Sequence, residues 1–153
     1  MNQADPPLLF EPLLLLLLFA ALWLTISTLL PRVSGWTKLA QRFHATQAAN
    51  GERFSVVSAR MGKGFFTIRY NNCLFFTVNN AGFHMSIMFF FRFQSPPLFI
   101  PWSEVESIEE KRLFFGRYMV IHLKNQGPLI SIRGRVGQAI KLAFDTASSQ
   151  NSF

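Results

Sequence analysis

Three histidines and one cysteine are the residues of this sequence best suited to metal binding or nucleophilic catalysis. His44, His84 and His122 lie far apart, and none stands in a metal-binding frame such as H-E-x-x-H. Isolated histidines are more often ordinary surface or core residues than ligands or general bases. Cys73 would need a neighbouring base to act as a nucleophile, and the sequence identifies none. We therefore expect a small buried or half-buried thiol there.

Other chemistry-bearing residues lie in two short runs. Paired carboxylates can perform acid and base catalysis, and four glutamates stand close together at Glu104, Glu106, Glu109 and Glu110. Because Lys111 and Arg112 follow immediately, a solvated and self-compensated charge patch is the favoured interpretation. The run Gly62-Lys63-Gly64 predicts a turn, since a phosphate-binding loop needs its glycines between a strand and a helix. We therefore expect no enzyme, no cofactor and no metal ion.

The composition bounds the class of protein. The 153 residues include 18 Phe and are 50% hydrophobic, but only 15% are charged. Such a chain can bury a core, which argues against long intrinsic disorder. A single cysteine allows no internal disulfide bond. The net charge of +7 suits an anionic partner, either a membrane surface or nucleic acid.

One segment is too apolar for a purely soluble protein. Residues 13–30 carry no charge, lie between two prolines, and would form a helix roughly 27 Å long, close to the ~30 Å hydrocarbon thickness of a bilayer. A cleaved signal peptide is disfavoured, because Asp5 and Glu11 precede the segment and no Lys or Arg does. A buried core helix is disfavoured, because the segment has no polar face. The sequence predicts a transmembrane helix over 13–30 and a short non-cytoplasmic tail over 1–12.

The charges on either side of this helix predict its orientation. All 15 Lys and Arg residues follow it, beginning with Arg32, Lys38 and Arg42. By the positive-inside rule, the part of the chain after the helix is therefore expected in the cytoplasm. Cys73 agrees with a reducing compartment.

A short amphipathic helix is predicted next, over 31–44. Its apolar positions recur at helical spacing, at Val33, Trp36, Leu39, Ala40 and Phe43. One interpretation places this helix in the membrane interface, where Trp36, Lys38, Arg42 and Phe43 would be the interface residues and Trp36 would lie at headgroup level. The other interpretation packs the apolar stripe on the following domain. The sequence favours neither.

From residue 51 to 147, period-two alternation followed by one helix predicts a β-domain. A three-residue loop over 71–73 is expected to join two strands, because it keeps their apolar residues on one face. A turn over 79–82 would pair Val78 with Phe83 and continue that face. The first three strands would then share one core face: Phe66, Ile68, Tyr70, Leu74, Phe76, Val78, Phe83, Met85, Ile87, Phe89 and Phe91.

The second half of the domain is expected to resume after Ser95-Pro96-Pro97, since two prolines remove two backbone donors from a sheet. Further strands are predicted over 98–105, 113–115, 119–123 and 129–133. Gly134 precedes an amphipathic helix, and residues 148–153 are predicted to be a frayed tail. The predicted buried core consists of Phe76, Phe83, Ile87, Ile121, Ile132 and Phe144.

Two segments carry a resemblance to a known fold. Residues 78–83 form a turn with Gly82 that leads into a strand, and Ile100-Pro101-Trp102-Ser103-Glu104-Val105 follows after a loop. They resemble the turn-Gly-strand and I-P-W-x-E-I patterns of bacterial PH-like and GRAM-like domains. With the N-terminal span, and with residues 34–40, 72–74 and 96–104, they also resemble small bacterial single-pass membrane proteins.

This resemblance implies an α+β, mainly β fold. A transmembrane helix would be followed by a PH-like antiparallel barrel of about seven strands, capped by a C-terminal helix. It also implies a place in the bacterial inner membrane, with the C-terminal domain in the cytoplasm. No particular ligand comes with it.

Two functions of different classes follow. The first is a membrane-anchored, non-enzymatic PH-like interaction module that binds a protein partner or anionic lipid headgroups at the cytoplasmic face. The second is a structural or assembly subunit of a larger membrane complex, which would dock through Met88, Phe90 and Trp102. Nucleic acid is not an expected partner, because the sequence has neither an RNP-type motif nor a basic recognition helix.

The charge asymmetry yields a direct test of topology. A reporter fused after Phe153 should be active only on the cytoplasmic side of the membrane, because all basic residues follow the span. Paired reporters that work only in the cytoplasm or only outside it measure this. Activity confined to the far side would contradict the prediction.

Overall fold

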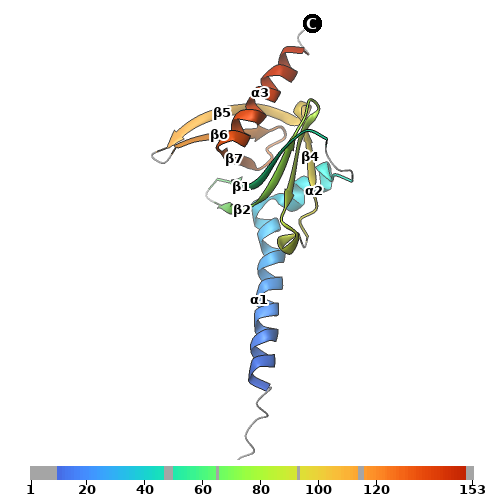
Figure 1. Cartoon of the computed structure of the whole chain (residues 1–153), viewed down its shortest axis with the longest axis vertical. Coiled ribbons are helices and arrows are strands. Elements are labelled where there is room, and N and C mark those ends of the chain that lie inside the picture. The colour runs from blue at the N-terminus through green and yellow to red at the C-terminus, as the bar shows by residue number, and fades with distance from the viewer. Residues whose placement is uncertain (1–9, 47–49, 65, 93, 114–115, 151–153) are drawn as a thin grey trace, which may run out of the picture.

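The N-terminal apolar segment forms one long helix, α1 (Phe10–Ser34), which projects from a β-rich domain (Figure 1). The computed structural model describes residues 10–46, 50–64, 66–92, 94–113 and 116–150. With 25 residues, α1 is long and apolar enough to cross a membrane, and all its leucines except Leu30 are exposed. It extends beyond the predicted span 13–30 at both ends and runs through Pro31. A proline inside a helix removes the backbone hydrogen bond to the carbonyl four positions earlier, here that of Ser27, and its ring crowds the same carbonyl.

The second helix, α2 (Trp36–Phe43), turns sharply away from α1. Gly35 between them has a φ of 83°, in the left-handed region that glycine adopts without strain. The predicted amphipathic helix over 31–44 is therefore divided, and its first residues belong to α1.

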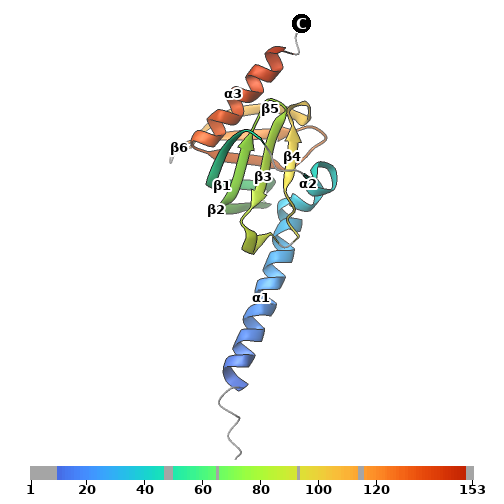
Figure 2. The same cartoon turned by 45° about the vertical axis from the view of Figure 1, so that its right-hand side comes forward.

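Seven antiparallel strands form one curled sheet, with the order β4-β3-β2-β1-β7-β6-β5 (Figures 1 and 2). A final helix, α3 (Arg135–Gln150), extends from the end of the domain that lies opposite α1. The predicted mainly β layout, with an N-terminal apolar helix and a C-terminal helix, is thus confirmed. The strands are β1 (Glu52–Lys63), β2 (Phe66–Val78), β3 (Gly82–Ile87), β4 (Leu98–Pro101), β5 (Val105–Leu113), β6 (Gly116–Leu123) and β7 (Leu129–Arg133).

The predicted loop over 71–73 is wrong, because β2 continues through it. The β1–β2 pairing is irregular there, with Asn72 at a φ of 51° and its side chain held by Ser58 at 2.8 Å. The true turn follows Lys63, at Gly64. Tyr70 and Leu74 nevertheless share the core face, because an even number of positions separates them along the strand. An asparagine with positive φ serves a bulge as well as a turn.

The third strand is shorter than predicted. It pairs Val78 with Phe83, as expected for a turn over 79–82, but it ends at Ile87. A single 3-10 turn, η1 (Phe89–Phe91), follows, so Phe89 and Phe91 are exposed instead of buried. The alternating pattern predicted too long a strand. In a run of phenylalanines, this pattern does not show where the pairing of β3 with its neighbours ends.

Three of the four clustered glutamates, Glu106, Glu109 and Glu110, lie on an edge strand, β5, where they belong to the expected self-compensated charge patch. Its charges are compensated within the β5–β6 hairpin: Glu109 contacts Lys111 at 3.3 Å, and Glu110 contacts Arg117 at 3.7 Å. The hairpin projects from the body of the domain (Figure 1). Of the strand predicted over 113–115, residues 114–115 lie outside the described part of the chain.

The core lies inside the curl of the sheet. Five of the six predicted core residues are buried, namely Phe76, Phe83, Ile87, Ile121 and Ile132. Phe144 is only half-buried, and its ring packs edge-on against Trp102 at 6.1 Å. The helix α3 closes the core with Val136 and Ile140, and it continues to Gln150, through the first residues of the predicted frayed tail.

Two phenylalanines of β2 offer a matched test of this core. Phe76→Ala should lower the free energy of unfolding by about 3–5 kcal/mol, because Phe76 is 1% exposed and its loss leaves a cavity. Phe66→Ala should cost less than about 0.5 kcal/mol, because Phe66 is 74% exposed. Denaturant unfolding of the full chain in mild detergent measures both, and similar losses would contradict the burial of Phe76 and the exposure of Phe66.

Candidate functional site

The end of α1 is fixed to the sheet by a buried polar contact. Ser34 is fully buried, and the Tyr70 hydroxyl of β2 donates a hydrogen bond to its Oγ at 2.8 Å. Burial raises the pKa of the Tyr70 phenol, so the group stays protonated and remains a donor at neutral pH. The backbone N–H of Trp36 also donates to Ser34 Oγ, at 3.4 Å. One serine therefore joins α1, α2 and β2.

Trp36 belongs to the domain core and not to the membrane interface. Its side chain is completely buried, 5.9 Å from the Tyr70 ring, and its Nε1 donates to the Pro96 carbonyl at 3.0 Å. Leu39 is buried beside it. The expectation that Trp36 lies at headgroup level is thus wrong, because the apolar stripe of α2 fills the sheet's open side next to α1. The alternative, packing on the domain, is what the structure shows.

The other three predicted interface residues of α2 differ from one another. Arg42 forms an ion pair with Glu104 at 3.1 Å, and its guanidinium lies over the Phe43 ring at 5.1 Å. Phe43 is half-buried. Lys38 is exposed and lines a groove of about 550 Å³ at the end of α1, together with Arg32, Arg42, Lys63 and Phe66. This basic groove, defined by Arg32, Lys38 and Lys63, brings together cations from α1, α2 and the β1–β2 hairpin.

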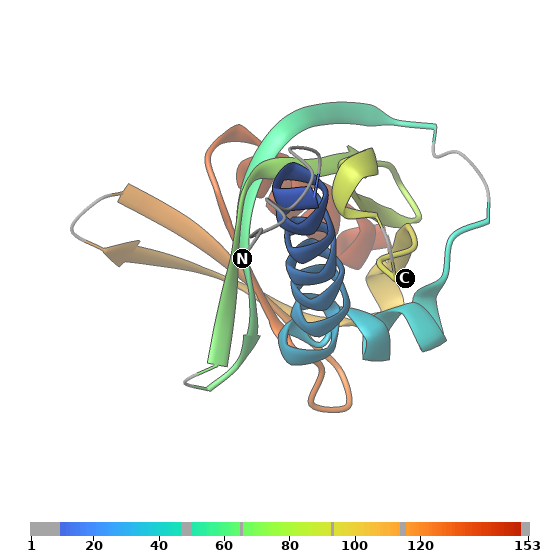
Figure 3. The ribbon, with the colours of Figure 1, turned by 90° about the horizontal axis from the view of Figure 1, so that it is seen from below.

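A second, apolar groove of about 320 Å³ runs between α1 and the sheet. It forms where β2 has no strand partner on the α1 side, because β3 pairs only from Leu74 onward. Its apolar walls include Trp23, Ile26 and Leu30 of α1 and Tyr70, Ile87 and Phe91 of the domain, and Arg69 also lines it. Seen along α1 in Figure 3, the η1 turn, α2 and the β1–β2 hairpin surround the helix.

The three residues predicted as a docking face do not form one surface. Phe90 is 69% exposed in η1, and Met88 is half-buried before it. Trp102 is buried between the rings of Phe83 and Phe144, and its Nε1 donates to the Asn79 carbonyl at 3.1 Å. Trp102 therefore has a structural role and is not part of an exposed docking face.

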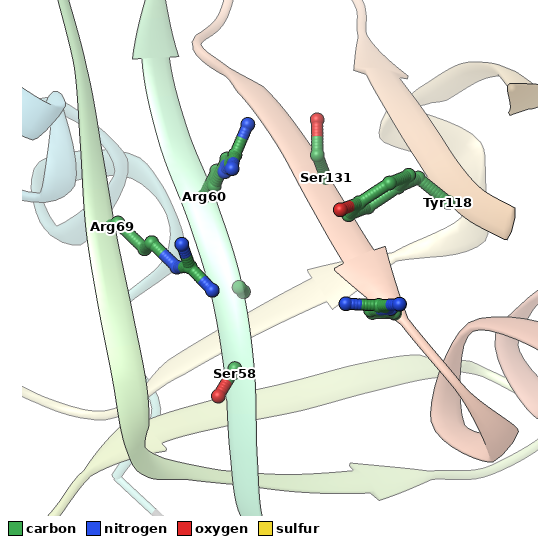
Figure 4. A pocket seen from close by; sticks show the side chains of 7 residues that line it. Ser58, Arg60, Arg69, Tyr118 and Ser131 are labelled. Carbon is green, nitrogen blue, oxygen red and sulfur yellow. The ribbon is translucent and has the colours of Figure 1, made fainter. Parts of the chain in front are cut away.

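An arginine cluster, Arg60, Arg69 and Arg133, lies on the outer face of the sheet. Arg60 pairs directly with Arg69 across β1 and β2, and Figure 4 shows Arg60 between Arg69 on one side and Ser131 and Tyr118 on the other. The guanidinium carbons of Arg60 and Arg133 lie 5.9 and 5.4 Å from the centre of the Tyr118 ring. The cluster borders a depression of about 30 Å³. Among the described residues none of the three arginines forms an ion pair.

Sequence analysis did not bring these three arginines together. Their neighbours Ala59, Tyr70 and Ile132 face the core, so strand parity alone places all three arginines outside. Their proximity requires the order β2-β1-β7, which pairs strands from distant parts of the chain.

The residues suited to catalysis remain scattered. Within the described residues no group of three or more His, Cys, Asp or Glu side chains could hold a metal ion. Cys73 is half-buried, and burial raises the pKa of its thiol, which disfavours the nucleophilic thiolate. His84 stacks on Phe99 at 4.5 Å, and burial lowers its pKa, so it is neutral at pH 7.

No protein-family model matches this chain, and a search of curated proteins finds no significant relative. The resemblance to PH-like domains therefore remains a prediction, and the function must be argued from the surfaces themselves.

The contact between Tyr70 and Ser34 can be tested by removing one oxygen. Tyr70→Phe should lower the free energy of unfolding by about 1 kcal/mol, the usual net contribution of a buried hydrogen bond. Tyr118→Phe is the matched control and should change it by less than about 0.5 kcal/mol, because its ring lies on the outer face. Both are measured by denaturant unfolding in mild detergent. Equal effects of the two variants would show that the hydrogen bond from Tyr70 to Ser34 does not stabilise the protein.

Proposed function

We propose that this chain is a single-pass membrane protein whose PH-like domain lies on the cytoplasmic face and binds anionic lipid headgroups without catalysing a reaction. The observation that carries the proposal is the basic groove at the end of α1. Arg32, Lys38 and Lys63 come from three elements, and they meet where the apolar helix enters the domain. A basic group near an anionic leaflet gains about 1 kcal/mol of attraction.

The junction with α1 makes this attraction effective. Because Ser34 and Tyr70 fix the domain on the helix, the groove stays beside the membrane surface and needs no further ordering to meet it. A lysine ammonium and an arginine guanidinium both bind phosphate oxygens, the arginine often with two parallel hydrogen bonds. Lipid headgroups of a bacterial inner membrane would supply such phosphates.

Arg42 contributes less to this groove than its charge suggests. Its guanidinium is already paired with Glu104 and lies over Phe43. We therefore assign headgroup binding to Lys38 and Lys63, beside Arg32, and a mainly structural role to Arg42.

The alternative, an assembly subunit that docks a protein through Met88, Phe90 and Trp102, is less well supported. Trp102 is unavailable because it is buried, and Phe90 lies in η1, close to α1. A protein partner remains a prediction that no contact in this structure favours.

Lipid binding can be measured as thermal stabilisation of the full chain in mild detergent. Added phosphatidylglycerol should raise the melting temperature, whereas phosphatidylcholine with the same acyl chains should not. At about ten times the dissociation constant, the gain is about 1.4 kcal/mol, or roughly 5 °C for a domain of this size. Raising the salt concentration should reduce it.

Three double variants, each with two positive charges removed, locate the site. Lys38→Gln with Lys63→Gln should abolish most of the stabilisation, because it empties the basic groove of its lysines. Arg112→Gln with Arg117→Gln should keep it, because both side chains contact Glu110 on the projecting hairpin. Arg60→Gln with Arg133→Gln, on the outer sheet face, should also keep most of it. Equal stabilisation by both lipids, or full stabilisation of the lysine variant, would contradict the proposal.

A further inference from the structure

Three consecutive phenylalanines lie in the open on this domain. Phe89, Phe90 and Phe91 are 79%, 69% and 49% exposed, and together they form the single turn η1. Leaving apolar side chains exposed to water instead of burying them is unfavourable by about 25 cal/mol for each Å² of apolar surface. The turn lies between strands and belongs to neither of them, because the preceding strand ends at Ile87 and the next begins at Leu98.

The turn lies beside α1. Phe91 lines the apolar groove opposite Trp23, Ile26 and Leu30 of the helix. Figures 1 and 2 both show η1 as the part of the domain that reaches furthest along α1. Arg92 follows directly, is exposed, and donates its backbone N–H to the Phe89 carbonyl.

The length of α1 decides what surrounds this turn. A bilayer needs about 20 apolar residues of helix, or roughly 30 Å. From Phe10 to Leu22, before the helix residues that line the groove, α1 covers only roughly 20 Å. If α1 crosses the membrane, the hydrocarbon layer of the bilayer must therefore also surround Trp23 and Ile26. It must end close to Leu30.

We infer that the η1 turn is a second membrane-contacting element, whose three phenylalanines insert into the boundary between headgroups and acyl chains beside α1. Phenylalanine side chains suit that depth, and Arg92 can extend its guanidinium from there to the phosphates. The apolar groove between η1 and α1 then opens toward acyl chains instead of water. This inference rests on the span of the proposed function and adds a second point of contact, which restricts rotation of the domain about α1.

Depth-dependent quenching of a single fluorophore tests the insertion in the full chain. In a Cys73→Ser background, single cysteines at Phe90, Leu17 and Leu142 are labelled with an environment-sensitive dye, and the protein is reconstituted in vesicles of phosphatidylcholine and phosphatidylglycerol. Leu142 of α3 is the matched control, since it is 68% exposed and Phe90 is 69% exposed. Leu17 reports on the span itself.

The expected pattern separates the two proposals. The label at Phe90 should be quenched by a nitroxide attached high on the lipid acyl chain, and severalfold less by aqueous iodide than the label at Leu142. The label at Leu17 should be quenched best by a nitroxide near the end of the acyl chain. A further label at Arg92 leaves all three phenylalanines in place and should behave like the one at Phe90.

Two results would overturn the inference. If iodide reaches Phe90 and Arg92 as readily as Leu142 while Leu17 stays protected, α1 spans but η1 does not insert. If Leu17 is also open to iodide, the span itself is absent, and the proposed function falls with the inference.

Discussion

The contact between the end of α1 and the open edge of β2 constrains every surface of this protein. Ser34 accepts hydrogen bonds from the Tyr70 hydroxyl and from the backbone of Trp36, and all three residues are buried. A buried hydroxyl that loses its partner pays the full cost of desolvation, so the helix cannot swing away cheaply. Gly35 then directs α2 across the sheet. The domain therefore packs directly against α1 and is not connected to it by a flexible linker.

The charges of the domain are arranged unevenly as a result. On the β5–β6 hairpin, acidic and basic side chains form ion pairs and largely cancel one another's charge. Near α1 and on the outer face of β1 and β2, cations meet without such compensation, and Arg60 stands directly opposite Arg69. Like charges opposite each other weaken strand pairing, and the Tyr118 ring offsets part of that cost. The net charge of +7 is therefore not spread evenly, and the positive potential is concentrated near α1 and on the outer face of β1 and β2.

Sequence reasoning was most successful where a long pattern had one physical cause. The apolar helix, the core face of β2 and β3, and the stripe of α3 all follow from period and hydrophobicity. It failed at local decisions that depend on distant partners. Asn71-Asn72 has the composition of a turn, but Ser58 of β1 holds Asn72 in a bulge. The end of β3 at Ile87 is equally invisible in a run of phenylalanines.

The candidate site shows the same division. Helical spacing was enough to place Lys38 on the surface. It could not decide whether the apolar Trp36 side chain packs against lipid or against the sheet. Spacing alone cannot distinguish two apolar environments. Arg69 and Arg133 join Arg60 only because the sheet order places β1 between β2 and β7. Such an arrangement is a property of topology, and no local window of sequence contains it.

The two edges of the sheet are protected in different ways, and this matters if α1 holds the protein in a membrane. β4 is short, and the chain at His44 and Ala45 covers it through bonds to Leu98 and Pro97. β5 is long and uncovered, but charged side chains fill its outer positions. Confinement to two dimensions raises the frequency with which copies collide. A free edge of β-branched residues would then recruit a neighbouring strand, whereas the exposed Glu, Lys and Arg side chains of β5 oppose such pairing and keep copies of the chain separate.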